Sequence, residues 1–563
     1  MTDVERAGKE YCRWVSCSAI DEELRRELHA IDGNEAEIYD RFSRELSFGT
    51  GGLRGIIGAG TNRMNMPVVR KATQGLADFV LANGGSSVCI AYDTRHFSRE
   101  YAVAAAETLC ANGIRVFMFT GVRPTPMLSF AVRKKKACAG IVITASHNPR
   151  EYNGYKVYGA DGGQLTDADA DAVSACIDKH DVLAAQPRLS LETARENGLL
   201  FDLDDVDQLY YDRVITLVEQ GSMILEHSKE LRILYSPLHG AGNVPVRRVL
   251  HELGFSSLDV VKAQEQPDGG FPTVRYPNPE DAEAFSLALA EAGEHPCDII
   301  LATDPDCDRI GIQVRDKAGG YQALSGNQVG VLLCDYIISE KRKKGTLGAN
   351  PAVIKTIVTT ELARRVCGYY GVEVADTLTG FKYIGEMIGE WERTGEHGFI
   401  FGFEESYGYL ADGFVRDKDA VIAAALICEM ALFHKLAGRT LIDALDDIYL
   451  LHGFEDERLL SVALDGCDGI EKASAIMDRF RLDPGSVFSD MRIKRVEDYL
   501  NGYNSLPKSN VLKLFFEDGS WLAVRPSGTE PKIKYYFGAS GESPAVVGKI
   551  LDKIEDAVRR KGS

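Results

Sequence analysis

Short runs of apolar and β-branched residues recur through the first half of the chain, separated by stretches with helical spacing. The clearest runs are residues 87–92, 115–119, 141–144, 232–235 and 299–302. Runs of this length predict buried strands, and their alternation with helices predicts an α/β fold with mixed or parallel sheets. Ligands in such sheets bind at loops beyond the carboxyl ends of the strands, so candidate chemistry is sought in the polar loops that follow these runs.

The end of the chain has a different pattern. Three strand-like runs, residues 511–517, 521–524 and 533–538, lie close together and precede a helical stretch at about 545–560. This order predicts a small α+β domain. Because 563 residues exceed the size at which a single hydrophobic core stops growing, we expect several domains, with boundaries that give residues 1–204, 205–320, 321–460 and 461–563.

The charge balance limits the possible partners. Lys and Arg number 64 against 83 Asp and Glu, a net charge of −19, which opposes binding to nucleic acid or to anionic membrane surfaces. The most apolar stretch, residues 421–433, is too short to span a bilayer and contains Glu429, so it predicts a buried helix. The N-terminus lacks the apolar segment of a secretory signal. Nothing in the sequence indicates an oligomeric state.

Twelve cysteines are scattered along the chain without a CxxC pair or a Cys/His cluster. Neither a zinc site nor a disulfide framework is therefore predicted. We expect a protein of the reducing cytoplasm.

The first chemical motif is ITASHNP, which follows an apolar run and presents Ser146 and His147 at the carboxyl end of a predicted strand. A hydroxyl at such a place can accept a covalent group. A turn whose Ser and Asn bond the local backbone explains the same residues. Lys156, in the nearby run NGYK, adds a cation.

The second motif is LATDPDCDR, in which Asp304, Asp306 and Asp308 alternate after another apolar run. Alternate side chains of an extended backbone share one face, and three carboxylates on one face suit Mg²⁺. An EF-hand calcium loop is excluded because Arg309 and Arg315 occupy its required Gly and Glu positions. A solvated acidic turn is the alternative, but three acids packed at a strand end repel one another without a cation.

The third motif, VRPSGTEPK at residues 524–532, combines two cations, two hydroxyls and the backbone amides around a glycine. That composition favours a phosphate cradle, although an ordinary Gly/Pro turn remains open. It is not a Walker loop, since GxxxxGK[ST] is absent. The Gly-rich run at residues 49–55 also lacks GxGxxG, but it places Arg54 among flexible amides.

The fourth motif, GFEESYG at residues 402–408, holds two carboxylates beside a hydroxyl. Carboxylates accept hydrogen bonds from vicinal diols, as sugar recognition requires. By itself the motif is more typical of a solvated turn.

Taken in this order, the four motifs resemble the α-D-phosphohexomutase family from about residue 40 to residue 540. SPLHGAG at residues 236–242 and PDGGFPT at 267–273 look like markers of the branch of phosphoglucomutases that is related to phosphopentomutases. The resemblance implies three α/β domains with mixed sheets and a smaller α+β C-terminal domain around a central cleft.

The resemblance also implies a role for each motif. Ser146 would be the phosphoserine, and Asp304, Asp306 and Asp308 would hold Mg²⁺ beside its phosphate. Sugar contacts would come from Glu404 and Ser406. The phosphate that is not transferred would be held by Arg525, Ser527, Gly528 and Thr529. Around the phosphoserine the family pattern points to Arg54, His147, Lys156 and Arg309, and in a separate loop to Gly380 and Lys382. Lys418 occupies the place of a proton-exchanging lysine, although an exposed surface lysine is the alternative.

The implied reaction interconverts glucose 1-phosphate and glucose 6-phosphate through glucose 1,6-bisphosphate. Phosphopentomutase and phosphomannomutase activities are alternatives, as are a phosphosugar phosphatase and a catalytically silent sugar-phosphate sensor. Three departures from the family pattern matter: Pro305, Cys307 and Phe403 stand where Gly is common. The chain also lacks the His that follows the sugar loop in dual phosphomanno/phosphoglucomutases, which weakens the mannose alternative.

Overall fold

The computed structural model describes residues 2–49, 51–464, 469–488, 490–526 and 532–561. The chain forms two compact units. The first comprises Met1–Ser325, Phe381–Phe401 and Ser406–Thr440, and the second comprises Gly326–Gly380, Gly402–Glu405 and Leu441–Ser563. Each unit is described by itself below.

The first unit begins with a six-stranded mixed sheet of order β1-β5-β4-β2-β3-β6. Its strands are β1 (Gly52–Ile56), β2 (Ser87–Tyr92), β3 (Arg115–Met118), β4 (Ala139–Ile143), β5 (Tyr152–Gly159) and β6 (Leu200–Asp202). The central strands β2 and β4 are parallel and buried along their whole length, which explains their unbroken apolar sequences. Strand β5 returns antiparallel to β4, so the Ser146 loop lies at the turn between them.

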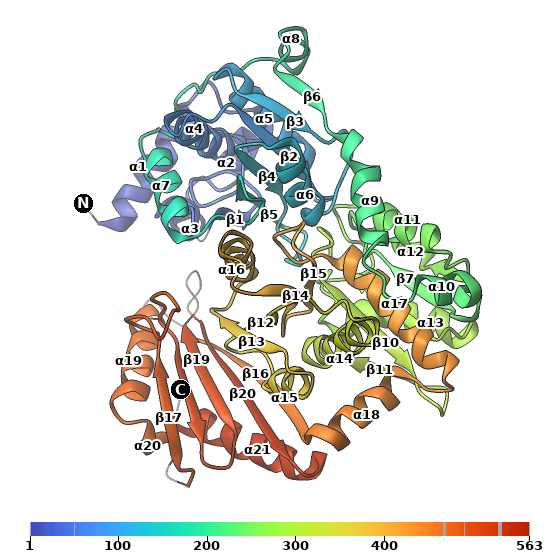
Figure 1. Ribbon diagram of the computed structural model, residues 1–563. Helices are drawn as coiled ribbons and strands as arrows, with labels where there is room; N and C mark the ends of the chain where they lie inside the picture. Colours follow the sequence, from blue (N-terminus) through green and yellow to red (C-terminus); the bar gives the residue numbers. More distant parts are fainter. Residues whose placement is uncertain (1, 50, 465–468, 489, 527–531, 562–563) are drawn as a thin grey trace. The chain divides into compact units, whose positions relative to one another are not determined.

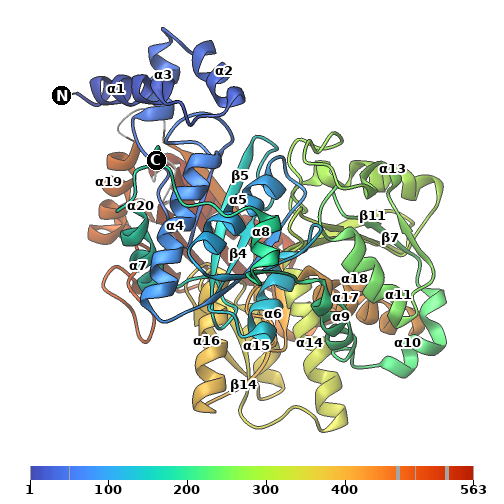
Figure 2. The same cartoon turned by 90° about the horizontal axis from the view of Figure 1, so that it is seen from above.

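Helices cover this sheet and extend its core. They are α4 (Met66–Ala82), α5 (Ser98–Ala111), α6 (Thr125–Lys135), α7 (Asp167–Ile177) and α8 (Leu191–Glu196). Three N-terminal helices, α1 (Asp3–Ser16), α2 (Glu22–Ala30) and α3 (Glu35–Phe42), lie at the outer edge of the same sheet domain (Figures 1 and 2). A capping box between Thr2 and Glu5 starts α1. Trp14 is fully buried and packs edge-on against Phe42, so these helices share the hydrophobic core of the sheet.

The second sheet of this unit has the order β11-β10-β9-β7-β8. Its strands are β7 (Ile233–Ser236), β8 (Leu258–Val260), β9 (Ile299–Thr303), β10 (Ile310–Arg315) and β11 (Tyr321–Leu324). Parallel β7 and β9 pair side by side, and β10 folds back antiparallel onto β9. The acidic loop therefore lies in the short connection between β9 and β10.

Several shorter helical segments accompany this sheet and the buried helix α17 (Ala420–Leu436). They are η1 (Asp204–Val206), α9 (Asp207–Ile215), α10 (Gly221–His227), η2 (Ser228–Glu230), α11 (Asn243–Leu253), α12 (Lys262–Glu265), η3 (Ala282–Phe285) and α13 (Ser286–Glu294). Helix α17 packs against α9, α10 and α11 and confirms the buried helix predicted from residues 421–433. Helix α16 (Phe381–Thr394) also belongs to the first unit.

Within the part of the chain that the structure describes, no single helix is long and apolar enough to cross a membrane. The pair α17 and α18 (Leu441–His452) passes that test only jointly and is bent by 85°. The first thirteen residues of α17 are buried inside the protein, which is typical of a core helix.

A third, four-stranded sheet has the order β13-β12-β14-β15. Its strands are β12 (Pro351–Thr356), β13 (Glu373–Thr377), β14 (Gly398–Glu404) and β15 (Gly408–Ala411). Strands β12 and β13 are parallel and belong to the second unit with helices α14 (Gly326–Lys344) and α15 (Leu362–Tyr369). Phe403 fills the space beside Gly330, where a Cβ would lie 2.1 Å from its ring, so this departure from the family pattern is accommodated by a glycine.

The C-terminal sheet is antiparallel and has the order β16-β20-β19-β18-β17. Its strands are β16 (Phe454–Ala463), β17 (Ile493–Asp498), β18 (Leu512–Phe516), β19 (Trp521–Pro526) and β20 (Lys532–Gly541). Helices α19 (Gly469–Leu482), α20 (Pro484–Val487) and α21 (Pro544–Lys561) accompany it, and the core lies between the sheet and α19 and α21. This arrangement, red in Figure 1, confirms the predicted α+β domain.

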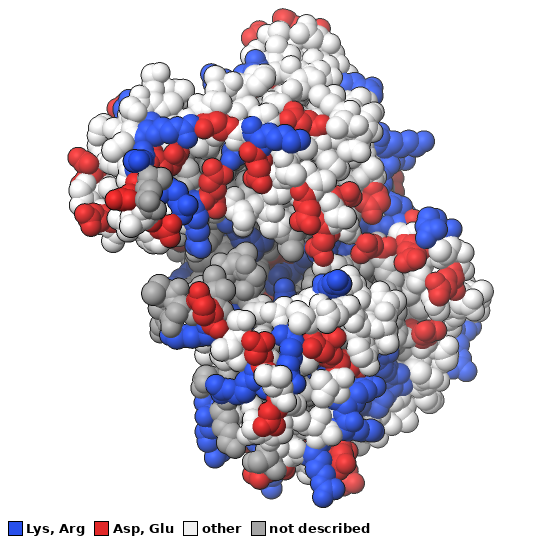
Figure 3. Space-filling view, turned by 90° about the vertical axis from the view of Figure 1, so that its left-hand side faces the viewer, with Lys and Arg blue, Asp and Glu red and all other residues white. Residues whose placement is uncertain are grey.

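Charge is mixed on the surface of the protein. On the face shown in Figure 3, acidic and basic side chains are interspersed. The cysteines that lie within the described residues are free thiols, as expected from their scattered positions.

Candidate functional site

The Ser146 turn is built by side chains at the carboxyl ends of β2 and β4. The backbone of Ser146 is left-handed, with φ 52°, and its N–H donates to the Thr144 hydroxyl at 2.8 Å. The Thr144 hydroxyl donates in turn to Asp93 at 2.7 Å. A left-handed conformation is uncommon for a residue with a side chain and persists where its surroundings hold it, so the turn is a constrained structure.

The acidic loop brings its three aspartates together. Asp304, Asp306 and Asp308 are each at most 1% exposed, and each offers a carboxylate oxygen within 4.8 Å of the others. Cys307, between the last two, has φ 52°. That conformation favours glycine and explains why glycine is common at this position in the family that the chain resembles.

The two loops meet directly. The Ser146 hydroxyl donates to Asp304 Oδ2 at 2.7 Å. Thr125, at the start of α6, donates from its hydroxyl to Asp306 Oδ2 at 2.9 Å and from its N–H to the Asp306 carbonyl at 2.9 Å. The two sequence motifs, 158 residues apart at Ser146 and Asp304, thus form one site.

Three cations lie beside these carboxylates. Lys156 Nζ is 2.8 Å from Asp306 Oδ2 and 3.6 Å from Asp308 Oδ2. Lys418 Nζ is 3.1 Å from Asp308 Oδ2, and Arg309 Nε is 3.8 Å from Asp308 Oδ1. The Lys418 side chain is only 12% exposed, so it is not the surface lysine that the sequence left open.

The pKa values of Asp304 and Asp306 are shifted in opposite directions. Burial raises the pKa of Asp304 well above its usual range, and the charges of Asp308 and Asp306 add to the effect. Burial acts in the same direction on Asp306, but Lys156 outweighs it and lowers the pKa of that carboxyl. Ser146 therefore faces the carboxyl whose charge is least stabilised without a further cation.

Two carboxylate oxygens of these aspartates have no hydrogen-bond donor among the described residues, and they indicate whether a metal ion fits the site. Asp306 Oδ1 and Asp308 Oδ1 are buried and accept no hydrogen bond from the described residues. A buried charged oxygen without a partner is costly, and hard divalent cations bind carboxylate oxygens. The carboxylates of Asp304, Asp306 and Asp308 fit such a cation. These three aspartates together with Lys156, Arg309 and Lys418 are called the acidic cluster below.

Two further predicted residues flank the serine. His147 Nδ1 is 3.3 Å from the Ser146 hydroxyl. Burial and the charges of Arg309 and Arg54 lower the pKa of His147 well below its usual value, so its imidazole is neutral at pH 7. Arg54, on β1, donates to the side chain of Asn148 at 3.1 Å, which brings this cation to the same turn.

The sugar-loop residues are placed by β14 and the turn after it. Glu404 is buried at the end of β14, and its Oε1 accepts the Gly380 N–H at 3.1 Å. Ser406 is half-buried in the turn before β15. The next residue, Tyr407, accepts the N–H of Ile310 at 3.1 Å, which ties this turn to the end of the acidic loop.

The other predicted residues lie elsewhere. Lys382 begins α16 and binds Asp167 at 2.5 Å. Arg525 is half-buried near the end of β19. Ser527, Gly528 and Thr529 lie outside the described residues.

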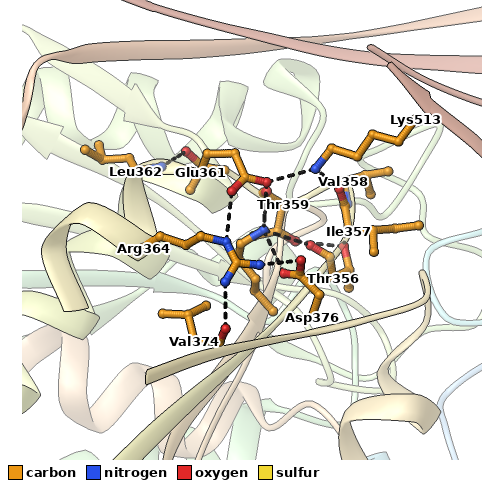
Figure 4. Close-up of polar contacts among 12 residues, drawn as sticks. Thr356, Ile357, Val358, Thr359, Glu361, Leu362, Arg364, Val374, Asp376 and Lys513 are labelled. Carbon is orange, nitrogen blue, oxygen red and sulfur yellow. Dashed lines mark hydrogen bonds and ion pairs between the residues drawn. The ribbon is translucent and has the colours of Figure 1, made fainter. Parts of the chain in front are cut away.

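The second unit contains a buried ion cluster that the sequence motifs do not include (Figure 4). Its members are Lys355, Glu361, Arg364, Asp376 and Lys513, called the second-unit cluster below. Glu361 Oε1 is 2.8 Å from Lys513 Nζ and 3.3 Å from Lys355 Nζ, and its Oε2 accepts from Arg364 at 3.0 Å. Lys513, on β18, points away from the α19–α21 core because neighbouring side chains of a strand alternate between faces.

This cluster adjoins the sugar loop. The hydroxyls of Thr356 and Thr359 donate to Glu405 Oε2 at 3.2 and 3.1 Å. Lys355 Nζ donates to the carbonyl of Thr359 at 3.1 Å. The residue after Glu404 is therefore held by the loop that carries the second-unit cluster.

Sequence reasoning missed Thr125, Asp93 and Arg95. Asp93 and Arg95 directly follow the buried run of β2, so the rule that chemistry follows strand ends could have found them. Thr125 could not be found in this way, because its contact with Asp306 joins residues 181 apart in the sequence.

Comparisons with known proteins give a consistent result. Four models of phosphoglucomutase/phosphomannomutase domains match the chain: alpha/beta/alpha domain I at residues 45–183, domain II at 208–319, domain III at 325–450, and the C-terminal domain at 481–557. A phosphoglucomutase of Staphylococcus epidermidis is 37% identical over 560 residues, covering 97% of this chain and 99% of that protein.

Solved structures share the fold. A phosphoglucomutase/phosphomannomutase family protein of Burkholderia thailandensis matches with a TM-score of 0.67 at 20% identity, covering 91% of this chain and 97% of that one. The phosphoglucomutase pp63/parafusin of Paramecium matches with a TM-score of 0.69 at 17% identity, covering 92% and 96%.

Proposed function

The chain belongs to the phosphoglucomutase/phosphomannomutase family, and we propose that it interconverts α-D-glucose 1-phosphate and glucose 6-phosphate through a phosphoserine at Ser146. The observation that carries the proposal is the hydroxyl of Ser146, 2.7 Å from Asp304 in a cluster of three buried acids. The activity named for the Staphylococcus relative supports the choice of substrate.

The proposed reaction has two half-reactions. Phosphorylated Ser146 transfers its phosphoryl group to the free hydroxyl of the sugar phosphate, so the Ser Oγ–P bond breaks and a new sugar O–P bond forms. The sugar hydroxyl loses its proton and the Ser146 oxygen takes one up. The product is glucose 1,6-bisphosphate. After the sugar reorients, its other phosphoryl group passes to the Ser146 oxygen, which loses its proton, and the released sugar oxygen takes up a proton.

The residues near Ser146 have matching chemistry. Asp304, Asp306 and Asp308 would hold Mg²⁺, which neutralises phosphoryl oxygens when it is bound. Arg54, Lys156 and Arg309 add positive charge for the phosphate. Lys418 is the candidate for exchanging a proton with the reacting sugar hydroxyl, since Asp308 and Asp417 orient its ammonium group. His147 contacts the Ser146 hydroxyl as a neutral imidazole.

The remaining proposed roles concern recognition. Glu404 and Ser406 would bind sugar hydroxyls, with Gly380 supporting Glu404. Arg525, Ser527, Gly528 and Thr529 would hold the phosphate that is not transferred, and Lys382 would assist from its own loop. We propose the domains 1–204, 205–320, 321–460 and 461–563 for phosphoserine, metal, sugar and phosphate binding, and a cytoplasmic location.

The test combines one variant with a substrate series. Ser146→Ala should lower turnover to background while the protein stays folded, and the Ser146 peptide of the active protein should carry the mass of a phosphate. Excess chelator should abolish turnover, and magnesium should restore it. A folded Ser146→Ala enzyme with near-normal turnover would remove the phosphoserine proposal.

The substrate series compares kcat/KM for glucose 1-phosphate, mannose 1-phosphate and ribose 1-phosphate with a catalytic amount of glucose 1,6-bisphosphate. We expect glucose 1-phosphate to lead, with incomplete discrimination against mannose because the two sugars differ only at C2. A higher value for ribose 1-phosphate would make phosphopentomutase the primary activity. Sustained release of inorganic phosphate from glucose 6-phosphate would indicate a phosphatase.

A further inference from the structure

Arg95 is a buried arginine that touches none of the acidic-loop carboxylates through a hydrogen bond. Its guanidinium group instead donates to the backbone carbonyls of the Ser146 turn, and its side chain has no exposed surface. The acceptors are the carbonyl oxygens of Ser146, Asn148, Pro149 at 2.8 Å and Tyr152 at 3.1 Å. One side chain thus fixes both ends of the turn that presents the Ser146 hydroxyl.

Arg95 is itself held from two sides. Asp93 Oδ2 lies 3.4 Å from Arg95 Nε, and Asp93 Oδ1 accepts the Arg95 N–H at 2.9 Å. The ring of Phe271 lies against the guanidinium group, 5.0 Å from centroid to Cζ. A guanidinium group stacked on an aromatic ring keeps its in-plane N–H groups free to donate.

Phe271 belongs to the PDGGFPT loop, which reaches Arg95 by close backbone contact. A Cβ added at Gly269 would lie 2.7 Å from the carbonyl carbon of Arg95, closer than real Cβ atoms approach. A Cβ at Gly270, its neighbour, would meet only side-chain atoms, Asp268 Oδ1 at 3.1 Å and His96 Nε2 at 3.6 Å. The first glycine of the pair is therefore required by packing against the Arg95 backbone.

The SPLHGAG loop supports the acidic loop in the same way. The Ala241 N–H donates to the Pro305 carbonyl at 2.8 Å. A Cβ at Gly240 would lie 2.6 Å from Pro305 Cα, and one at Gly242 would lie 2.7 Å from the Cys307 sulfur. Gly240 thus allows the close approach of the Pro305 backbone, and Gly242 leaves room for the side chain of Cys307.

His239 joins the two supporting loops. It is 3% exposed, and its Nε2 lies 2.9 Å from the hydroxyl of Thr273 while its Nδ1 lies 3.2 Å from the carbonyl of Gln266. Its carbonyl accepts the Asp268 N–H at 3.2 Å. Residues 236–242 and 267–273 are thus one connected structure, which contacts both Arg95 and the acidic loop.

From these contacts we propose that Arg95 is a positioning residue for phosphoryl transfer, and that residues 236–242 and 267–273 are its support and not elements of sugar selection. Arg95 holds the left-handed Ser146 turn so that the hydroxyl faces Asp304. A misplacement of about 1 Å in such a site can cost about 10²-fold in rate. The proposal rests on the phosphoserine chemistry proposed above.

Lysine at position 95 keeps the charge but loses the planar set of five donors, so it cannot hold all four carbonyls at once. Arg95→Lys should lower kcat about 10²-fold. KM for glucose 1-phosphate should change less than about twofold, since sugar-binding residues are untouched. Single-turnover phosphorylation of Ser146 by glucose 1,6-bisphosphate should slow by the same factor as kcat. Arg99→Lys, at an exposed position of α5, is the matched control and should leave all three quantities unchanged.

A pair of glycine variants tests the supporting loop if Arg95→Lys fails to fold. Gly269→Ala should lower kcat at least about tenfold, because the new methyl group must displace the Arg95 backbone, whereas Gly270→Ala should not. Neither variant should change the ratio of kcat/KM between glucose 1-phosphate and mannose 1-phosphate.

The outcomes separate this inference from the proposed function. If Ser146→Ala is inactive but Arg95→Lys or Gly269→Ala behaves like its control, the positioning role is wrong and the phosphoserine stands. A changed substrate ratio in Gly269→Ala would make the loop an element of selection and would also overturn the inference. An active Ser146→Ala enzyme would remove the proposed function itself.

Discussion

The two buried charge clusters of the molecule differ in how they are neutralised. In the second-unit cluster, Glu361 is bound by three cations, and the pKa of its carboxyl is lowered by Lys355 and Lys513 against the effect of burial. In the acidic cluster, Asp304 has its pKa raised, and Asp306 and Asp308 each keep an oxygen without a hydrogen bond from the described residues. Asp376 Oδ1 of the second-unit cluster also accepts no hydrogen bond, but it lies 3.1 Å from Lys355 Nζ. The acids of that cluster are thus paired with cations, whereas Asp304, Asp306 and Asp308 could hold a further cation.

The comparison shows why burial of charge alone does not identify a functional site. Removing one partner from a network of paired buried charges is costly, whereas buried oxygens that lack a partner cost stability that binding can recover. The position of each cluster agrees with this distinction. Lys513 joins β18 to the loop after β12, while the acidic cluster surrounds the Ser146 hydroxyl.

The largest effect is expected from removing one charge of the acidic cluster. Asp308→Asn should lower kcat by about 10²–10³-fold, the loss that follows removal of one preorganised electrostatic group. The unfolding temperature of the chelator-treated protein should fall, because Lys418 and Lys156 lower the pKa of Asp308 against the effects of burial and of Asp306 and would lose a charged partner. Asp259→Asn, at an exposed position of β8, serves as the control. Near-normal turnover of Asp308→Asn would contradict the metal proposal.

Removing a cation from the second-unit cluster should act on stability and not on turnover. Lys513→Met should destabilise the pairing of β18 by about 3 kcal/mol, because Glu361 loses a buried partner. Hydrogen exchange of the β18 and β19 amides measures this directly, and Lys494→Met on the exposed side of β17 is the matched control. Unchanged exchange in Lys513→Met would show that the cluster is not a structural anchor.

Lys418→Met should lower kcat by about 10²-fold with little change in KM, since proton transfer matters mainly in the transition state. Lys418→Arg keeps the charge next to Asp308 but cannot release a proton at neutral pH. Steady-state kinetics of the two variants therefore separate a role of Lys418 in proton transfer from a role of its positive charge. Full activity in Lys418→Arg would leave only an electrostatic role, and a pure KM effect would make Lys418 a binding residue.

The smallest effect concerns the link between the second-unit cluster and the sugar loop. Thr359→Val removes one of the two hydroxyls that hold Glu405 and keeps the side-chain shape. The loss of one hydrogen bond to a charged group should reduce kcat/KM for glucose 1-phosphate by about tenfold, through roughly 1.5 kcal/mol. Thr394→Val, at an exposed position at the end of α16, is the control. A wild-type kcat/KM in Thr359→Val would show that the second-unit cluster does not contribute to sugar recognition.

Much of the fold follows from local patterns. The apolar run at residues 87–92 forms β2 with the same bounds, and the predicted C-terminal strands and helix appear as β18, β19, β20 and α21. These predictions succeed because a buried strand must be apolar along its length and because antiparallel strands with short connections pair with their neighbours in sequence. The motifs at Ser146 and Asp304 also meet, since the two side chains are hydrogen-bonded.

The amino-acid sequence by itself determined the kind of chemistry, since hydroxyl, carboxylate and phosphate-binding groups follow predicted strands in an order that resembles one family. Only the tertiary structure decided which side chains complete the site. Arg95, Thr125 and the loop with Phe271 act through contacts between distant segments, and Lys418 is half-buried beside Asp308 in spite of its charged sequence context. Such contacts carry no periodic or local signal, because their energy arises only when separate elements pack together.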